Sequence, residues 1–219
     1  MKESKKMVNP EFVDQEASVV LVGSFNPKIF HPQWFARHEI VPEVDLDGAD
    51  VEIIHPEIAK FTFPWVSIEV LQNRFTARTR DVAHYSPLRD LVISTFSLLA
   101  HSPVRQLGMN LTMIHTAKDE DSWHKIGDTL APKTVWEKSL PERIGLLSMR
   151  VQSPRTDELP GKITVSVESR PEYGVSISFN SHVDLGEDDS LYDILSEYWE
   201  KAIDQGKTIC ETTIREALK

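Results

Sequence analysis

Residues 61–101 constrain the fold more than any other stretch of this sequence. Apolar side chains alternate with polar ones on either side of Gln72 and Asn73; they are Val66, Ile68, Val70, Phe75 and Ala77. A period of two is typical of half-buried strands, so the stretch predicts a hairpin. A helix is expected next, with Ser86 as its cap and Pro87 at its first position, and its apolar stripe is Leu88, Leu91, Val92, Thr95, Phe96 and Leu99. We therefore expect a sheet whose apolar face is covered by this helix.

The same two periods continue through the rest of the chain. Further strands are expected at residues 18–25, 39–44, 51–57 and 104–116, and around residues 147–151, 163–167 and 175–179. Ser190, with Asp193 three residues later, resembles a capping box and begins a long helix whose apolar residues are Leu191, Ile194, Leu195, Tyr198, Trp199, Ala202 and Ile203. Four tryptophans are expected in the core or at an interface, namely Trp65, Trp123, Trp136 and Trp199.

The order of these elements predicts an α+β fold with an internal duplication. A strand, a short helix, several strands and a long helix occur once in residues 17–102 and again in residues 103–219. We expect the two units to form one compact domain, in which an antiparallel sheet packs against the two long helices. Residues 1–16 are polar and lack a sustained period, which predicts a flexible arm.

Three segments resemble a sporadically distributed family of bacterial proteins of unknown function. They are residues 66–80, residues 85–91 and residues 107–110, in which Arg74-Phe75 and Gly108-Met109-Asn110 fit the pattern of that family. The family has no established activity, so the resemblance bears on the fold and not on chemistry. Its patchy distribution is compatible with an accessory role in a mobile or defence system, which is a hypothesis.

Composition excludes several classes of protein and disfavours others. The net charge of -10 disfavours broad electrostatic binding to nucleic acid or to an anionic membrane. No apolar run approaches the roughly 18 residues of a membrane span, and the first ten residues lack the apolar segment of a secretory signal, so a cytoplasmic protein is expected. Cys210 is the only cysteine, which rules out an intrachain disulfide and a cysteine-based zinc site.

The strongest candidate for a binding site is a row of arginines on the second strand of the hairpin. Alternation places Arg74, Arg78 and Arg80 on the outward side of that strand. Guanidinium groups in such a row suit phosphates, carboxylates or an acidic partner surface. The alternative is an ordinary solvated sheet face on which acids such as Glu52 and Glu69 pair with the arginines across the strands.

Catalytic motifs are absent from the sequence, and no catalytic residue, metal or cofactor is predicted. Neither a nucleophile elbow nor a glycine-rich phosphate or dinucleotide loop occurs. The histidine cluster that comes nearest to a metal site comprises His115, Asp119, Glu120, Asp121 and His124. The alternative is that these acids complement the amino end of a helix. His31 and His38 are seven residues apart with Pro32 between them, which argues against a ligand pair.

Three functions remain open from the sequence. The first is a non-enzymatic protein-binding or adaptor module that associates with itself, because the chain has a well-patterned core and sheet edges that need covering. The second is nucleic-acid or nucleotide binding through Arg74, Arg78 and Arg80. The third is a metal-assisted hydrolase that uses His115, Asp119 and His124.

Overall fold

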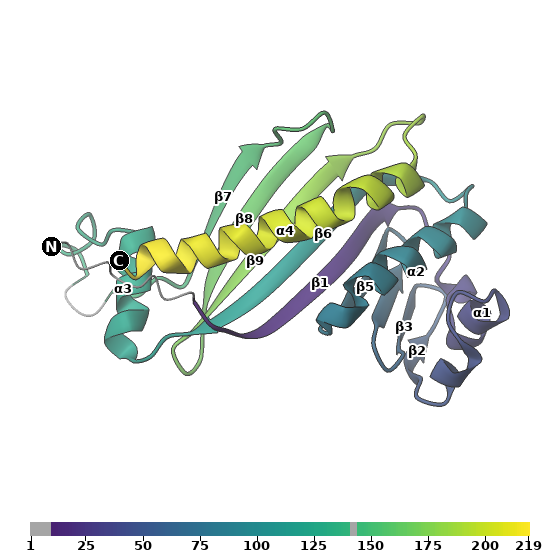
Figure 1. Ribbon diagram of the computed structural model, residues 1–219, viewed down its shortest axis with the longest axis horizontal. Helices are drawn as coiled ribbons and strands as arrows, with labels where there is room; N and C mark the ends of the chain where they lie inside the picture. The colour runs from purple at the N-terminus through teal and green to yellow at the C-terminus, as the bar shows by residue number, and fades with distance from the viewer. Residues whose placement is uncertain (1–9, 141–143) are drawn as a thin grey trace, which may run out of the picture.

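A computed structural model of the protein describes residues 10–140 and 144–219. Nine strands form one open antiparallel sheet in the order β2-β3-β4-β5-β1-β6-β9-β8-β7 (Figure 1). The strand bounds are β1 Phe12–Gly23, β2 Asp50–Ile54, β3 Ile58–Thr62, β4 Ser67–Leu71, β5 Arg74–Thr79, β6 Val104–Thr116, β7 Ser148–Pro154, β8 Gly161–Arg170 and β9 Gly174–Asp184. The α+β class and the antiparallel sheet are thereby confirmed.

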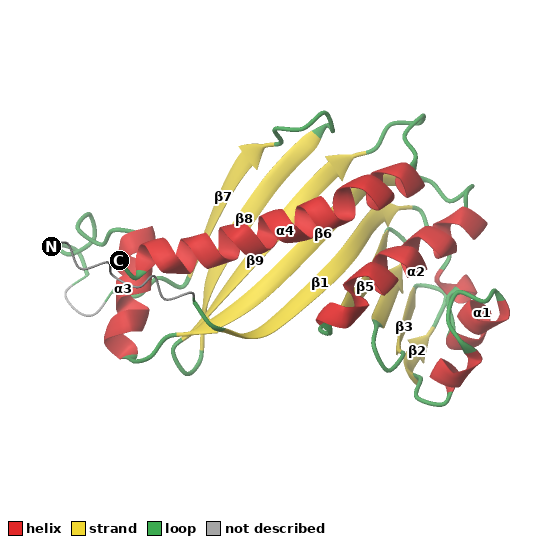
Figure 2. Cartoon of the chain, in the orientation of Figure 1, coloured by secondary structure: helices red, strands yellow, loops and turns green. Residues whose placement is uncertain are grey.

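The four α-helices pack against the same face of this sheet (Figure 2). Their bounds are α1 Pro32–Arg37, α2 Tyr85–Leu98, α3 Glu120–Leu130 and α4 Leu191–Ala217, and three short 3-10 turns are η1 Pro27–Ile29, η2 Glu43–Leu46 and η3 Val82–His84. α2 lies on β1 and β5, and α4 lies on β6 and β9. No helix in the described part of the chain is long and apolar enough to cross a membrane.

The core lies between these helices and the sheet, where the period-two pattern predicted it. The buried side chains of the strands include Ile68, Val70, Phe75 and Ala77 from the hairpin, and Leu107, Met109, Leu111 and Met113 from β6. β6 spans the expected residues 104–116, because its alternation is long and unbroken. The predicted strands β7, β8 and β9 also form and pair in continuous register.

α4 begins where the capping signal predicts and covers the centre of the sheet. The Ser190 side chain accepts a hydrogen bond from the backbone N–H of Asp193 at 3.2 Å, as a helix cap does. Trp199 is the largest fully buried side chain of the described residues. Gly206 lies against the ring of Phe179, and a Cβ atom at this position would lie 2.8 Å from its Cδ1 atom. The helix therefore approaches the sheet as closely as a residue without a side chain allows.

Several predicted boundaries are wrong, each for a local reason. α2 begins at Tyr85, so Ser86 is not its cap; η3 leads directly into the helix, and Asp81 caps that turn by accepting from the N–H of Ala83. No strand forms at residues 39–44, where Glu39 has a positive φ of 55° and η2 follows. The expected arm is ordered from Phe12 onward because β1 pairs there with β6, and its first nine residues lie outside the described residues.

The two halves of the chain meet at the centre of the sheet. β1 and β6 are neighbours, and each also pairs with the last strand of its own half, β5 or β9. The remaining strands of each half continue outward in reverse chain order to β2 and to β7. One continuous sheet therefore spans both halves.

Cys210 is buried in α4 and its thiol contacts the carbonyl oxygen of Ile177 at 3.8 Å. Burial raises the pKa of this thiol to about 12, so its reactive thiolate form is scarce at neutral pH. We expect the native protein to resist a thiol reagent such as iodoacetamide at pH 8, and to react fully with one equivalent in denaturant. Rapid labelling without denaturant would show that α4 opens readily from the sheet.

Candidate binding face

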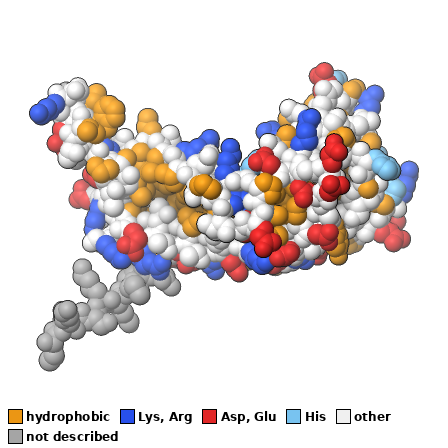
Figure 3. Space-filling view, turned by 90° about the horizontal axis from the view of Figure 1, so that it is seen from above, with side chains coloured by type: hydrophobic (Ala, Val, Ile, Leu, Met, Phe, Trp, Pro, Cys, Tyr) orange, Lys and Arg blue, Asp and Glu red, His pale blue; other side chains and the backbone are white. Residues whose placement is uncertain are grey.

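The face of the sheet opposite the helices forms a broad polar surface. It is called the open face, and its central polar residues are Ser18, Thr76, Arg78, Asn110, Thr112, Thr164, Ser178 and Asn180. Strand alternation brings them together, because each lies one residue away from a core side chain on its own strand. The molecule is hollowed on this side between two raised ends (Figure 3). A partner with a convex surface would fit such a shape.

An amide pair occupies the middle of the open face. Asn110 on β6 and Asn180 on β9 are directly opposite in the register, and the Asn180 amide donates to the side-chain oxygen of Asn110. The Asn110 amide in turn donates to the backbone oxygens of Ser18 and Gly108, each at 3.3 Å. A Cβ atom at Gly108 would lie 3.0 Å from the amide nitrogen of Asn180. The absence of a side chain at this position therefore leaves the space that the amide pair occupies. The amides are thus held in fixed positions.

Small hydroxyl side chains surround this pair. The hydroxyls of Thr112 and Ser178 lie 2.9 Å apart on the same two strands. Thr164 on β8 is opposite Asn180, and Ser18 on β1 is opposite Asn110. A row of short donors and acceptors therefore crosses β1, β6, β9 and β8, and its side chains lose little rotamer entropy when they bind.

The three arginines lie on the open face at the expected positions of β5 and just beyond its end. Arg74 donates to Glu69 at 3.1 Å, and Arg80 donates to Glu16 at 3.3 Å. Arg78 lies opposite Ser18 and Ser67, and its half-buried side chain has no ion pair or hydrogen bond within the described ranges. Two of the three positive charges are therefore balanced by carboxylates on neighbouring strands.

The second acid named in the alternative interpretation, Glu52, pairs with Lys60 at 2.6 Å and not with an arginine. The open face thus contains paired charges of both signs, and Arg78 is the one charged residue among its central polar residues named above. Exposed pairs of this kind contribute little to stability, and they leave only a weak net field.

Comparison with models of known protein families finds none that matches this chain, and no curated protein matches it. The resemblance to the sporadic bacterial family therefore rests on the residues quoted above. Function has to be argued from the geometry of the chain itself.

The residues of the metal hypothesis do not form a site. The Nδ1 atom of His115 lies 2.7 Å from the backbone oxygen of Glu11. Asp119 caps α3, and the hydrogen bonds from the side chain and backbone of Ser122 lower the pKa of its carboxyl group. Within residues 10–140 and 144–219, no group of three or more His, Cys, Asp or Glu side chains is placed to hold a metal ion. The acids at the start of α3 thus act on the helix, as the alternative interpretation proposed.

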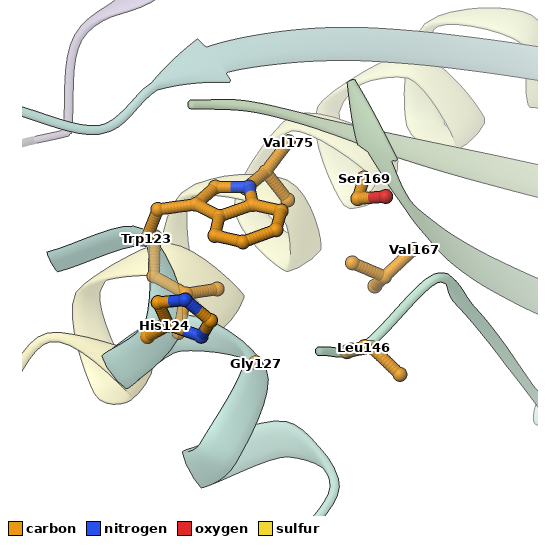
Figure 4. A pocket seen from close by; sticks show the side chains of 8 residues that line it. Trp123, His124, Gly127, Leu146, Val167, Ser169 and Val175 are labelled. Carbon is orange, nitrogen blue, oxygen red and sulfur yellow. The ribbon is translucent and has the colours of Figure 1, made fainter. Parts of the chain in front are cut away.

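The cavity beside α3 is too small for a substrate. It is lined by Trp123, His124 and Leu146 against Val167 and Val175 of the sheet, and it encloses about 20 Å³ (Figure 4). That volume holds about one water molecule. Two wider grooves of about 560 Å³ and 710 Å³ flank α4 and are open to solvent.

Sequence reasoning missed the amide pair. Asn110 entered through the family resemblance, Asn180 was assigned no role, and the sequence does not show that β6 and β9 are neighbours. The signal that was present is Gly108, because a glycine within a long strand often marks a close approach of another group.

Proposed function

We propose that the chain is a non-enzymatic protein-binding adaptor that associates with itself and takes a partner on the open face. The observation that carries this proposal is the ordered row of short polar side chains across the uncovered centre of the sheet. The fixed amides of Asn110 and Asn180 offer directional hydrogen bonds without the cost of ordering long side chains.

The charges favour a protein over a nucleic acid as the partner. Binding along a phosphate backbone needs several free cations, whereas Arg74 and Arg80 are already paired with carboxylates. The base-stacking mode of single-stranded nucleic acid also needs aromatic side chains, and the central residues of the open face are Ser, Thr, Asn and Arg. Arg78 alone supports the nucleic-acid alternative, as the arginine of the row without a carboxylate partner in the described structure.

We also propose that the two halves arose by duplication. The support is topological: in each half the first strand pairs with the last strand, and a long helix follows that last strand. An ancestral dimer of one half, joined through two copies of the central strand, would have had the same sheet.

Replacing Thr164 by arginine should reduce partner capture at least about tenfold, a loss of about 1.4 kcal/mol in binding free energy. The long charged side chain would stand beside the amide pair, because residue 164 is opposite Asn180, and it would prevent close approach. The measurement is affinity purification from the native host at moderate salt, with quantitative mass spectrometry and the ultraviolet absorbance ratio of each eluate.

The matched control is Thr208→Arg, which makes the same chemical change on the exposed side of α4. It should leave capture unchanged, and both variants should keep the unfolding midpoint of the wild type. A partner lost equally from both variants, or retained by both, would contradict the open face as the binding site. An eluate rich in nucleic acid that disappears at high salt would replace the proposal with the arginine alternative.

A further inference from the structure

The two edges of the sheet differ in how they are protected. β2 has a register shift between Val51 and Ile53, and it carries the acids Asp50 and Glu52. Irregular pairing and charge are common devices that prevent an edge strand from pairing with another chain. β7 has no such device over residues 148–153: it pairs with β8 in continuous register, and Arg150 is its one charged residue.

The backbone of β7 presents outward hydrogen-bonding groups that pair with no other backbone group among the described residues. The carbonyl oxygen of Leu147 accepts from the N–H of Ser169 on the β8 side. Because these groups alternate along an antiparallel strand, Met149, Val151 and Ser153 also point theirs toward β8, and Ser148, Arg150 and Gln152 point theirs away from the sheet. The outward row is a template for one more strand.

Apolar side chains accompany this free edge. Leu147 is 78% exposed and Val151 is 52% exposed, and Val151 lies opposite Val165 on the helix side of the sheet. α4 packs on β9 and β6, which lie two and three strands inward from the edge. Figure 3 looks down on this edge and shows hydrophobic side chains gathered at its surface. A strand added at this edge would cover these apolar side chains.

We propose that β7 pairs with β7 of a second copy, antiparallel, about a two-fold axis through Val151. In this register Arg150 lies opposite Gln152 of the other copy and exchanges two backbone hydrogen bonds with it, and symmetry repeats the pair. Val151 meets its own counterpart on the axis, on the apolar side. The inference rests on the self-association in the proposed function and gives it a site.

Charge and proline placement select this register. An axis through Arg150 would set two guanidinium groups directly opposite each other, which is unfavourable. With the axis at Val151, Pro154 falls opposite Ser148 at the end of the paired segment, where its missing N–H costs one terminal hydrogen bond. A symmetric contact of this kind closes as a dimer, because each β7 edge is then used once.

The turn after β7 holds the edge in place. The side chain of Arg155 is 5% exposed, donates to Ser181 on β9 at 2.6 Å and forms a two-point ion pair with Asp157. The guanidinium lowers the pKa of the Asp157 carboxyl group, so the pair stays charged at neutral pH. The edge is thus anchored to the sheet at the end where the second copy would begin its own pairing.

The first test is cross-linking through Val151→Cys. Opposed residues in a non-hydrogen-bonded antiparallel pair have Cα atoms about 4.5 Å apart, within the range that a disulfide spans. Treatment with diamide, which accepts the two electrons and two protons of the thiols, should convert most of this variant into a covalent dimer. Ser153→Cys is the matched control: its counterpart would lie about 14 Å away along the strand, so it should stay uncross-linked. Buried Cys210 adds no background.

The second test removes one outward N–H. Gln152→Pro should abolish the dimer in sedimentation equilibrium, and Gln152→Ala, which keeps that N–H, should retain it; concentrations from about 1 to about 100 µM cover a weak association. Far-ultraviolet circular dichroism checks that both variants remain folded. If Gln152→Pro unfolds, Val151→Lys, which opposes two ammonium groups on the axis, replaces it.

A monomeric wild type, or equal cross-linking of the Val151→Cys and Ser153→Cys variants, would overturn the β7 dimer. Partner capture by a monomer that still responds to Thr164→Arg would leave the proposed function of the open face intact. Loss of the Thr164→Arg effect with an intact β7 dimer would overturn the open face and leave the dimer.

Discussion

Replacing Gly206 by valine should lower the free energy of unfolding by about 3 kcal/mol, the upper end of the usual cost of overpacking a core. A Cβ atom at this position would lie 2.8 Å and 3.1 Å from two ring atoms of Phe179, and 3.3 Å from the Cβ atom of Leu111. Valine adds two more methyl groups. α4 would have to lift from β6 and β9, the strands that it covers.

Helix propensity alone predicts the opposite sign for Gly206→Val. Glycine in a helix interior is less favourable than most other residues, by up to about 1 kcal/mol relative to alanine. The clash outweighs this gain because the ring of Phe179 and the Cβ atom of Leu111 already occupy the space that the valine side chain needs. Thr208→Val, an exposed position on the same helix, is the control and should change stability by less than about 0.5 kcal/mol. Urea denaturation followed by tryptophan fluorescence measures both; a stabilised Gly206→Val variant would show that α4 is not seated as described.

Trp199→Ala should cost about 3–5 kcal/mol, the range for truncating a large buried aromatic side chain. Trp199 is fully buried on the sheet side of α4, and its removal leaves a cavity that the regular strands beneath cannot fill. At a typical domain stability of about 5–15 kcal/mol, this loss would leave the chain close to its unfolding threshold at 37 °C.

The matched control for Trp199→Ala is Trp136→Ala, the same substitution at a side chain that is 55% exposed. Its expected cost is below about 0.5 kcal/mol. Trp199→Phe gives a further check, because the indole N–H of Trp199 lacks a hydrogen-bond partner in the described structure. Trp199→Phe should therefore recover most of the stability that Trp199→Ala loses. Differential scanning calorimetry should give the highest unfolding temperature for Trp136→Ala, a lower one for Trp199→Phe and the lowest for Trp199→Ala. Equal effects at both tryptophans would contradict the placement of α4.

Trp136 shows where sequence reasoning reached its limit. It was predicted to lie in the core or at an interface; it is exposed on a loop after α3, so the core is wrong and the interface stays a prediction. Trp199 was predicted with better reason, since six other apolar residues repeat around it at helical spacing. Periodicity is informative because several residues together identify the buried face of a whole helix or strand. A single aromatic residue indicates only that a large apolar side chain is present.

The predicted starts of the helices depended on capping residues, and a neighbouring element can override such a signal. Ser190 caps α4 as predicted, and Ser86 does not cap α2, although both are followed by helical periodicity. The difference lies in η3, whose turn supplies the start of α2 and leaves Ser86 within the helix, where its hydroxyl donates to Glu200 of α4. A 3-10 turn of three residues has no period that could reveal it.

The candidate site was predictable in part. The sequence placed the arginine row on the outward side of the hairpin, and the alternative interpretation named Glu69 as an acid that pairs with the row, which the ion pair with Arg74 bears out. It did not reveal the pairing of Arg80 with Glu16 or of Asn110 with Asn180. Those contacts depend on which strands of distant sequence become neighbours, and a single chain carries no record of this.

The central position of β1 has a consequence for the route by which the chain folds. Val19 on this strand lies opposite Ala77 on one side and opposite Met109 on the other. Both contacts close long loops. The chain loses the entropy of loop closure before the core contacts can stabilise the sheet. Until β6 pairs with it, β1 is the exposed edge of the part of the sheet that the first half forms. The order in which loops close, more than the strength of any single contact, will therefore set how fast this protein reaches its native state.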